Sequence, residues 1–336
     1  MQITKASEDS GAFLFPRRIP DKHPHSAQSR DKRCRNDRKG CSFMSLLKGI
    51  STALVTPFDR RNRIDYSALE NMIARQIEAG IAGLVICGTT GEPVTLEGEE
   101  RQELLSFVVN QTAGRVPVIA GVCGNNTLKA AKEAASAAEI GVNGILAVTP
   151  YYNKATQKGM VAHFTAIANA AQLPVILYNV PSRTGLNLLP ETAAELAQKP
   201  YIDGIKEASG NVAQAVSVRS LCPEEFALYS GNDEIIVPLL SIGGSGAISV
   251  LANIAPELCV RMYRLFDEGQ YREAGKLQIA VKPLIDALFA EVNPIPVKAA
   301  AKLLGICEDV VRAPLTVAEE STVFRLIEEM KKLNLI

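Results

Sequence analysis

Short apolar runs rich in β-branched residues alternate along this chain with stretches of helical periodicity. Eight runs are typical of strands, at 50–55, 84–87, 118–122, 145–148, 175–178, 202–205, 226–229 and 247–250. Their hydrophobicity is continuous rather than alternating, which indicates strands covered on both faces, as in a parallel sheet. Successive runs begin about 20 to 35 residues apart, the length of a βα unit. The pattern predicts an α/β protein with a (β/α)8 fold, a TIM barrel.

The helical stretches carry their own boundary signals. Asp65 is placed to cap a helix in which Leu69 and Ile73 are four residues apart. Gly80 follows this helix at the position that favours a left-handed backbone, and another helix is expected over 127–140. A doubly wound sheet is the alternative fold, but neither Gly-x-Gly-x-x-Gly nor Gly-x-x-x-x-Gly-Lys-Ser/Thr occurs. The barrel is therefore the favoured fold.

Four further helical stretches follow the eighth strand, at 256–269, 270–289, 294–304 and 316–333. We expect a barrel over residues 44–269 and a C-terminal helical annex over 270–336, packed on the barrel's side or serving an oligomer interface. The stretch 235–256 contains no charged residue, but its Pro and Gly residues would break a single membrane-spanning helix. A helix end, a turn and a buried strand fit this stretch better.

Charge is distributed unevenly along the chain. The 36 basic and 36 acidic residues cancel, but residues 1–43 carry ten basic and five acidic side chains, so the remainder has a net charge of −5. An acidic body argues against nucleic acid or an anionic membrane as the main partner. The polar, Arg-rich segment 1–43 predicts a disordered tail. Met44 is then a candidate start of translation, and a partner-binding arm is the alternative.

Histidine and cysteine restrict the possible chemistry. Only His163 lies beyond residue 43, so a zinc site built on two or three histidines is excluded there. A Ser–His–Asp triad would depend on this one residue, whose place in a predicted helix indicates a structural role. The seven cysteines form no Cys-x-x-Cys pair, and their number is odd. They indicate reduced, mostly buried thiols and a cytoplasmic protein.

The chemistry of a (β/α)8 barrel lies at the carboxyl ends of its strands. The second strand is followed by 88–92, Gly-Thr-Thr-Gly-Glu, whose hydroxyl and backbone N–H groups suit a carboxylate or phosphate. Lys206 ends the sixth strand, where desolvation lowers the pKa of a lysine and leaves a nucleophilic amine. Such an amine forms a Schiff base with a ketone or aldehyde. The competing interpretation is a rim lysine paired with Glu207.

Other polar side chains at the same strand ends could assist. Tyr178 and Tyr152 could move protons together with Thr89, because phenols titrate too high to act as bases alone. Ordinary tyrosines of a barrel rim are the alternative, and the threonines could instead cap the helix expected near 97–110. Arg183 suits bidentate capture of a carboxylate, or is a solvated loop arginine.

Six motifs occur in order at these strand ends and in the annex. They lie at 88–92 (GTTGE), 149–153 (TPYYN), 177–185 (LYNVPSRTG), 204–209 (GIKEAS), 246–249 (GAIS) and 293–298 (NPIPVK). Together they resemble the dihydrodipicolinate synthase family of pyruvate-dependent class I aldolases, from about Leu46 to the C-terminus. The resemblance implies the condensation of pyruvate with L-aspartate 4-semialdehyde in lysine and diaminopimelate biosynthesis.

The resemblance assigns a role to several residues. Lys206 would form the Schiff base with pyruvate, and Tyr178 would donate and accept protons. Thr89 and Tyr152 would complete this relay, with Tyr152 reaching in from a neighbouring subunit. The resemblance therefore implies a homo-oligomer, either a dimer or a tetramer. It implies no metal or organic cofactor.

The remaining implied residues bind the substrates. Thr90 would bind the pyruvate carboxylate, with Ile248 and Gly231 lining the pocket, and Arg183 would hold the carboxylate of the aldehyde. N-acetylneuraminate lyase and keto-deoxy-sugar-acid aldolases share the lysine and the strand-five tyrosine. The loop 181–184 favours the short carboxylated aldehyde over a sugar. A catalytically idle binding barrel is disfavoured, because the lysine and the tyrosines are present.

Three positions depart from the pattern of lysine-inhibited family members. Such members typically carry His at the positions of Gly98 and Arg101 and Glu at that of Lys129, whereas Asn125 and Tyr151 are kept here. Lys129 replaces an acid by a charge of the same sign as a lysine ammonium group. The sequence therefore predicts little or no feedback inhibition by lysine.

Overall fold

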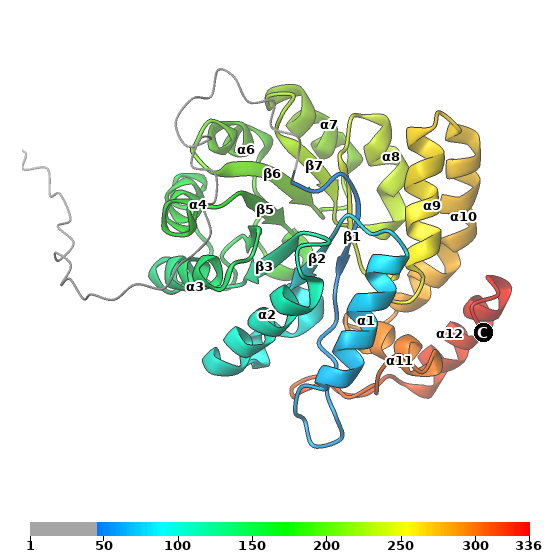
Figure 1. Cartoon of the computed structure of the whole chain (residues 1–336). Helices are drawn as coiled ribbons and strands as arrows, with labels where there is room; N and C mark the ends of the chain where they lie inside the picture. The colour runs from blue at the N-terminus through cyan, green and yellow to red at the C-terminus, as the bar shows by residue number, and fades with distance from the viewer. Residues whose placement is uncertain (1–45) are drawn as a thin grey trace, which may run out of the picture. The chain divides into compact units, whose positions relative to one another are not determined.

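The computed structural model describes residues 46–336, so the predictions for residues 1–43 and for Met44 lie outside the described residues. Eight parallel strands close into a barrel in sequence order (Figure 1). They are β1 (Gly49–Ala53), β2 (Gly83–Ile86), β3 (Val118–Val122), β4 (Gly144–Val148), β5 (Val175–Asn179), β6 (Ile202–Glu207), β7 (Ala227–Ser230) and β8 (Gly246–Ser249). Each overlaps a predicted apolar run. The TIM barrel is confirmed.

Helices lie around this barrel and continue beyond it (Figure 1). They are α1 (Tyr66–Glu78), α2 (Gly98–Thr112), α3 (Thr127–Ile140), α4 (Gln157–Ala171), α5 (Pro181–Thr184), α6 (Pro190–Ala197), α7 (Val212–Leu221), α8 (Ile236–Ser241), α9 (Pro256–Asp267), α10 (Tyr271–Leu288), α11 (Ile295–Leu303) and α12 (Glu320–Lys332). The predicted boundary signals hold. Asp65 Oδ1 accepts a hydrogen bond from Ala68 N, and Gly80 has φ +81°.

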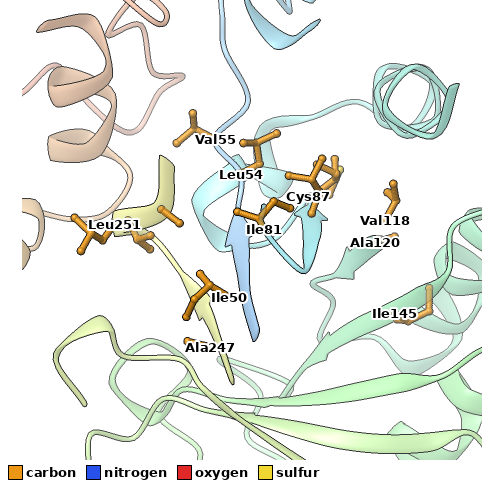
Figure 2. Packing of buried hydrophobic residues seen from close by; sticks show 14 of the residues in the cluster. Ile50, Leu54, Val55, Ile81, Cys87, Val118, Ala120, Ile145, Ala247 and Leu251 are labelled. Carbon is orange, nitrogen blue, oxygen red and sulfur yellow. The ribbon is translucent and has the colours of Figure 1, made fainter. Parts of the chain in front are cut away.

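Strand alternation divides the apolar side chains into two layers. Val85, Ile119 and Ile248 belong to a cluster inside the barrel. Their strand neighbours Leu84, Val118 and Ala247 belong to the larger cluster between the barrel and the helices. Figure 2 shows side chains of this outer layer around β1. Because both layers are buried, each strand reads as a continuous apolar run.

The C-terminal helices share the outer layer with the barrel. Val281 and Leu284 of α10, Val297 of α11 and Leu326 of α12 belong to the same hydrophobic cluster as the strand side chains. In Figure 1, α9 and α10 run beside each other at one side of the barrel. The helical annex is thus present, and its proposed start at residue 270 remains a prediction.

The uncharged stretch folds as expected for a buried segment of a barrel. It forms α8, a turn through Gly243 and Gly244, β8 and the 3₁₀ turn Leu251–Asn253. No helix among residues 46–336 is both long enough and apolar enough to cross a membrane.

Candidate active site

The parallel register of three strands places a lysine between two tyrosines. Tyr178 of β5 pairs with Lys206 of β6, and Lys206 pairs with Tyr229 of β7. Both tyrosines belong to the cluster inside the barrel, whereas Ile205 packs in the outer layer. Alternation along β6 therefore turns Lys206 inward. Its Nζ lies 4.4 Å from the centroid of the Tyr178 ring, and the residue is only 5% exposed.

The environment of Lys206 increases the share of neutral amine. Burial lowers the pKa of Lys206 to about 8, because the charged form loses more solvation than the neutral form. The carboxylate of Asp233 opposes this shift, and the guanidinium of Arg183 adds to it. A lysine with this pKa has a much larger fraction of nucleophilic amine near neutral pH than an exposed lysine.

The alternative of a rim lysine paired with Glu207 is wrong. Glu207 follows Lys206 on the strand and so faces the opposite side of the sheet. Its carboxylate accepts hydrogen bonds from Asn179 Nδ2 at 3.0 Å, Gln214 Nε2 at 3.1 Å and Ser209 N at 2.7 Å. Through these contacts the Glu207 carboxylate holds β6 to neighbouring elements. It is therefore not paired with Lys206, which lies inside the barrel.

Tyr178 is a buried phenol that stays protonated. Burial raises the pKa of Tyr178 to about 12, and the side chains of Arg183 and Thr89 partly offset this rise. Such a phenol can donate a proton, but it needs a neighbouring hydroxyl to exchange that proton with solvent. Thr89 is suitably placed, because it begins the 3₁₀ turn Thr89–Gly91 directly beyond β2.

The same turn presents Thr90 as a binding group. Thr90 is buried, and its Oγ1 accepts a hydrogen bond from Asn293 Nδ2 at 2.9 Å. The hydroxyl hydrogen can therefore be donated to an anion. The alternative that the threonines cap α2 is wrong, since Glu97 precedes that helix and forms a capping box with Glu100.

Two small or apolar residues border the lysine. A Cβ added to Gly231 would lie 2.5 Å from Ala208 Cβ and 3.1 Å from Lys206 Cε. Only glycine therefore leaves space beside the lysine stem at this point. Ile248 of β8 is buried in the same inner cluster as Tyr178. Their roles in lining a pyruvate pocket stay predictions.

Arg183 and Tyr152 lie nearer the solvent. Arg183 is exposed on α5, where its Nη2 donates to the backbone oxygen of Asn293 at 3.3 Å. Asn293 also bonds to Thr90, so Arg183 belongs to the same mouth of the barrel, and its charge acts on both Lys206 and Tyr178. Tyr152 follows β4 with φ +67° and is 89% exposed. Among residues 46–336 it makes no hydrogen bond to Tyr178, so one chain does not complete the predicted relay.

The part of the chain that carries these side chains matches one protein family. The model of the Dihydrodipicolinate synthetase family matches residues 46–333. The chain belongs to this family. The 4-hydroxy-tetrahydrodipicolinate synthase of Alkaliphilus oremlandii is 48% identical over 291 residues, which cover 87% of this chain and 100% of the relative.

Solved structures of the family superpose on this chain. Dihydrodipicolinate synthase from Cyanidioschyzon merolae, with lysine bound, is 41% identical, with a TM-score of 0.85 and coverage of 87% of this chain and 100% of that one. The chloride-inhibited enzyme from Acinetobacter baumannii, complexed with pyruvate, is 38% identical, with a TM-score of 0.84 and coverage of 87% and 100%.

Two residues near the site escaped sequence reasoning. Asn293 lies within a recognised motif, but nothing local to it shows that it bonds to Thr90, 203 residues away. Asp233 lies in the polar segment after β7, yet only the closed barrel shows its effect on Lys206. Asn293 lies in the turn before α11, and its place directly before the predicted helix 294–304 is the one signal that could have marked it.

Other candidate chemistry is absent from the described chain. No group of three or more His, Cys, Asp or Glu side chains within residues 46–336 could hold a metal ion. His163 of α4 is buried and shares a 2.9 Å hydrogen bond with Thr127, and burial lowers its pKa to about 4. This is the structural role that the sequence predicts. The five cysteines in this range are free thiols, of which Cys87, Cys222 and Cys259 are buried.

A cavity of about 520 Å³ lies at α2 and α3, and Lys206 is not among its lining residues. Its lining includes Gly98, Arg101, Lys129, Lys132, Glu133 and Tyr151. Glu133, its one acidic side chain, is paired with Arg101 at 3.1 Å. Within residues 46–336, Lys129 and Lys132 form no ion pair. The cavity is therefore net positive.

Proposed function

We propose that this chain is a 4-hydroxy-tetrahydrodipicolinate synthase, a Schiff-base-forming lyase that condenses pyruvate with L-aspartate 4-semialdehyde. The observation that carries the proposal is the buried Lys206 beside Tyr178 at the carboxyl end of β6. The synthase named in Alkaliphilus oremlandii, covered over its whole length, supports the same reaction. The pyruvate complex of the Acinetobacter enzyme supports the first substrate.

In the first half of the reaction, the neutral amine of Lys206 attacks the keto carbon of pyruvate. This addition forms a C–N bond and turns the keto oxygen into a hydroxyl group. The hydroxyl group then receives a proton through Tyr178 and Thr89 and leaves as water, so that a C=N bond to Lys206 replaces the C=O bond. Thr90 donates its hydroxyl hydrogen to the pyruvate carboxylate, since Asn293 already occupies one of its acceptor positions. The protonated imine then acts as the electron sink.

In the second half, the methyl group loses a proton to the relay and the imine becomes an enamine. The enamine carbon attacks the aldehyde, and the aldehyde oxygen takes a proton to become a hydroxyl group. The amine of the aldehyde substrate then displaces Lys206 from the imine carbon, which closes the ring and releases the lysine. Arg183 orients the aldehyde through its carboxylate.

The relay implies an assembly of several chains. The side chain of Tyr152 is 89% exposed, and its backbone has a left-handed conformation, so the side chain can enter the site of a second copy of the chain. The proposal therefore includes at least a homodimer in which each protomer completes its partner's site, and a tetramer is compatible with it. The free thiols of Cys87, Cys222 and Cys259 support a cytoplasmic location.

The direct test is turnover with both substrates. Purified protein, pyruvate and aspartate semialdehyde are coupled to the reductase that consumes the product, and nicotinamide oxidation is followed. Robust turnover is expected. If pyruvate is trapped on Lys206 but no turnover occurs, the aldehyde assignment is wrong and a sugar-acid aldolase becomes the better proposal.

Arg183→Ala is expected to raise KM for the aldehyde about 10- to 100-fold, the value of one charge-assisted bidentate contact, with a smaller effect on pyruvate. Arg183→Lys keeps the charge but loses the planar fork, so it should recover only part of the affinity. Initial rates at varied aldehyde concentration give this result. An unchanged KM for the aldehyde in Arg183→Ala would remove Arg183 from the binding site.

L-Lysine at millimolar concentration is expected to leave turnover unchanged. The net positive cavity with Lys129 and Lys132 repels a lysine ammonium group. A lysine titration of the coupled assay measures this, with Lys129→Glu as the matched variant that restores an acid. Half-inhibition of the unmodified protein at sub-millimolar lysine contradicts the prediction.

A further inference from the structure

A buried carboxylate follows the strand next to the Schiff-base lysine. Asp233 lies just beyond β7 and is 2% exposed. Its Oδ2 accepts hydrogen bonds from the backbone N–H groups of Val250 at 3.0 Å and Leu251 at 2.8 Å. Its Oδ1 is buried and has no hydrogen-bond partner among residues 46–336. An unpartnered buried carboxylate oxygen is costly, so its presence requires an explanation.

The turn that carries Asp233 packs on the lysine itself. Gly231, two residues earlier, lies so close to Lys206 that an added Cβ would be 3.1 Å from the lysine Cε. The backbone oxygen of Asp233 also accepts a hydrogen bond from Gln278 Nε2 of α10 at 2.8 Å. The turn is thus held from outside by α10 while its inner side faces the lysine stem.

Charged and titratable groups surround this pair from several elements. Asp233 after β7 and the Cys123 thiol after β3 raise the pKa of Lys206, whereas burial and Arg183 of α5 lower it. Burial raises the pKa of Asp233, and the Ser249 hydroxyl, two backbone N–H groups and Lys206 oppose that rise. Asp233 is the one carboxylate that acts on Lys206 within residues 46–336.

The Asp233 carboxylate also has a neighbour on its outer side. The Cys259 thiol of α9 lies 3.9 Å from Ser249 Oγ, and burial followed by the Asp233 charge raises the pKa of this thiol well above its usual value. Cys259 therefore stays neutral. It provides no charge that could balance Asp233, and Lys206 is the cation that acts on this carboxylate.

A negative charge near the lysine nitrogen would stabilise the protonated imine of Schiff-base chemistry. Formation of the imine converts the neutral amine of Lys206 into a nitrogen that is positively charged in the protonated imine. A buried positive charge is unfavourable unless a fixed opposite charge is nearby. In the proposed reaction, Thr90 binds the pyruvate carboxylate and Arg183 binds the aldehyde carboxylate. Neither side chain is negative, and the pyruvate carboxylate is already bound by Thr90, so Asp233 is the carboxylate of the protein that acts on Lys206.

We propose that Asp233 is a positioning residue whose fixed carboxylate is the counter-charge for the protonated imine at Lys206. This inference rests on the proposed Schiff-base function. Asp233 forms no covalent bond and transfers no proton. The lysine nitrogen bonds to the keto carbon, and the keto oxygen leaves as water. The Asp233 carboxylate then balances the positive charge of the imine nitrogen without touching it. Because the two backbone N–H groups hold Oδ2 in place, no reorganisation is needed when the charge develops.

Asp233→Asn tests the proposal with pyruvate alone. The amide oxygen can keep both backbone N–H bonds while the charge is lost. Cyanoborohydride trapping of pyruvate on Lys206 is measured against pH by mass spectrometry. The rate of trapping rises with pH as Lys206 loses its proton, and this rising part is the acid limb of the profile. Since the carboxylate raises the pKa of Lys206, its loss should move the acid limb to lower pH by about 1 unit. The plateau rate of trapping should fall about tenfold or more, because the imine loses its counter-charge.

Matched variants separate charge from structure. Glu207→Gln removes a buried carboxylate adjacent to Lys206 on the opposite face of β6, and the acid limb should not move. Asp233→Glu keeps the charge and should keep the limb. If Asp233→Asn does not fold, Asp233→Ser is measured in its place. The proposal is overturned if a neutral variant at position 233 shows its acid limb at the same pH as the unmodified protein or as Glu207→Gln.

The same experiment distinguishes this inference from the proposed function. Absence of any pyruvate adduct in the unmodified protein overturns the Schiff base and this inference with it. A normal adduct in the unmodified protein together with an unmoved limb in the neutral variant overturns only the role of Asp233. The aldehyde takes no part in the measurement, so an error in its identity has no effect on the result.

Discussion

Lys206→Ala should abolish turnover, by about 10⁴-fold or more, as removal of a covalent nucleophile does in other enzymes. The same change should abolish trapping of pyruvate by cyanoborohydride. The reason is that the described structure offers one buried lysine beside Tyr178 at the carboxyl ends of the strands. Turnover in the coupled assay and peptide mapping of the trapped adduct measure the two effects.

Lys206→Met serves as the control for folding. It keeps an unbranched side chain of similar length in the buried site, so the free energy of unfolding should be preserved or rise as a desolvated amine is removed. Turnover should be lost as completely as in the alanine variant. Trapping of pyruvate on any other lysine of the unmodified protein would refute the mechanism.

Lys298→Met should lower the free energy of unfolding by about 3–5 kcal/mol, because it leaves a buried carboxylate without its partner. Lys298 of α11 is fully buried, and its Nζ contacts Glu92 Oε1 at 2.5 Å and the oxygen of Val310 at 2.7 Å. Glu92 directly follows the turn that carries Thr90 and has φ +55°. The affinity for pyruvate should therefore fall as well.

Urea unfolding at a fixed protein concentration measures this effect. Lys302→Met is the matched control on the same helix, since Lys302 is half exposed and pairs with Asp309 at 2.8 Å. Its cost should stay below about 1 kcal/mol. The double variant Glu92→Gln and Lys298→Met should recover part of the loss. Equal costs for Lys298→Met and Lys302→Met would contradict the prediction.

The barrel could be predicted because its signals are local. Each strand is covered by helices outside and by side chains inside, so its residues form a continuous apolar run that any eight-unit α/β fold must repeat. Helix α3 runs over 127–140 as predicted, and Gly141 follows it with φ +103°. Lys206 and Tyr178 were identified for the same reason, since each stands at the end of such a run.

The sequence by itself therefore determined the fold class, the order of the strands and the residues at their carboxyl ends. Only the tertiary structure decided which polar groups meet there. Asn293 bonds to Thr90 across 203 residues, and Lys298 bonds to Glu92 across 206. Asp233 acts on Lys206 from the turn beyond the next strand. The spacing of hydrophobic residues depends only on residues that are close in the sequence, so it can be recognised without the structure. The partner of a buried polar group is decided by closure of the barrel and packing of the C-terminal helices, which bring distant residues together.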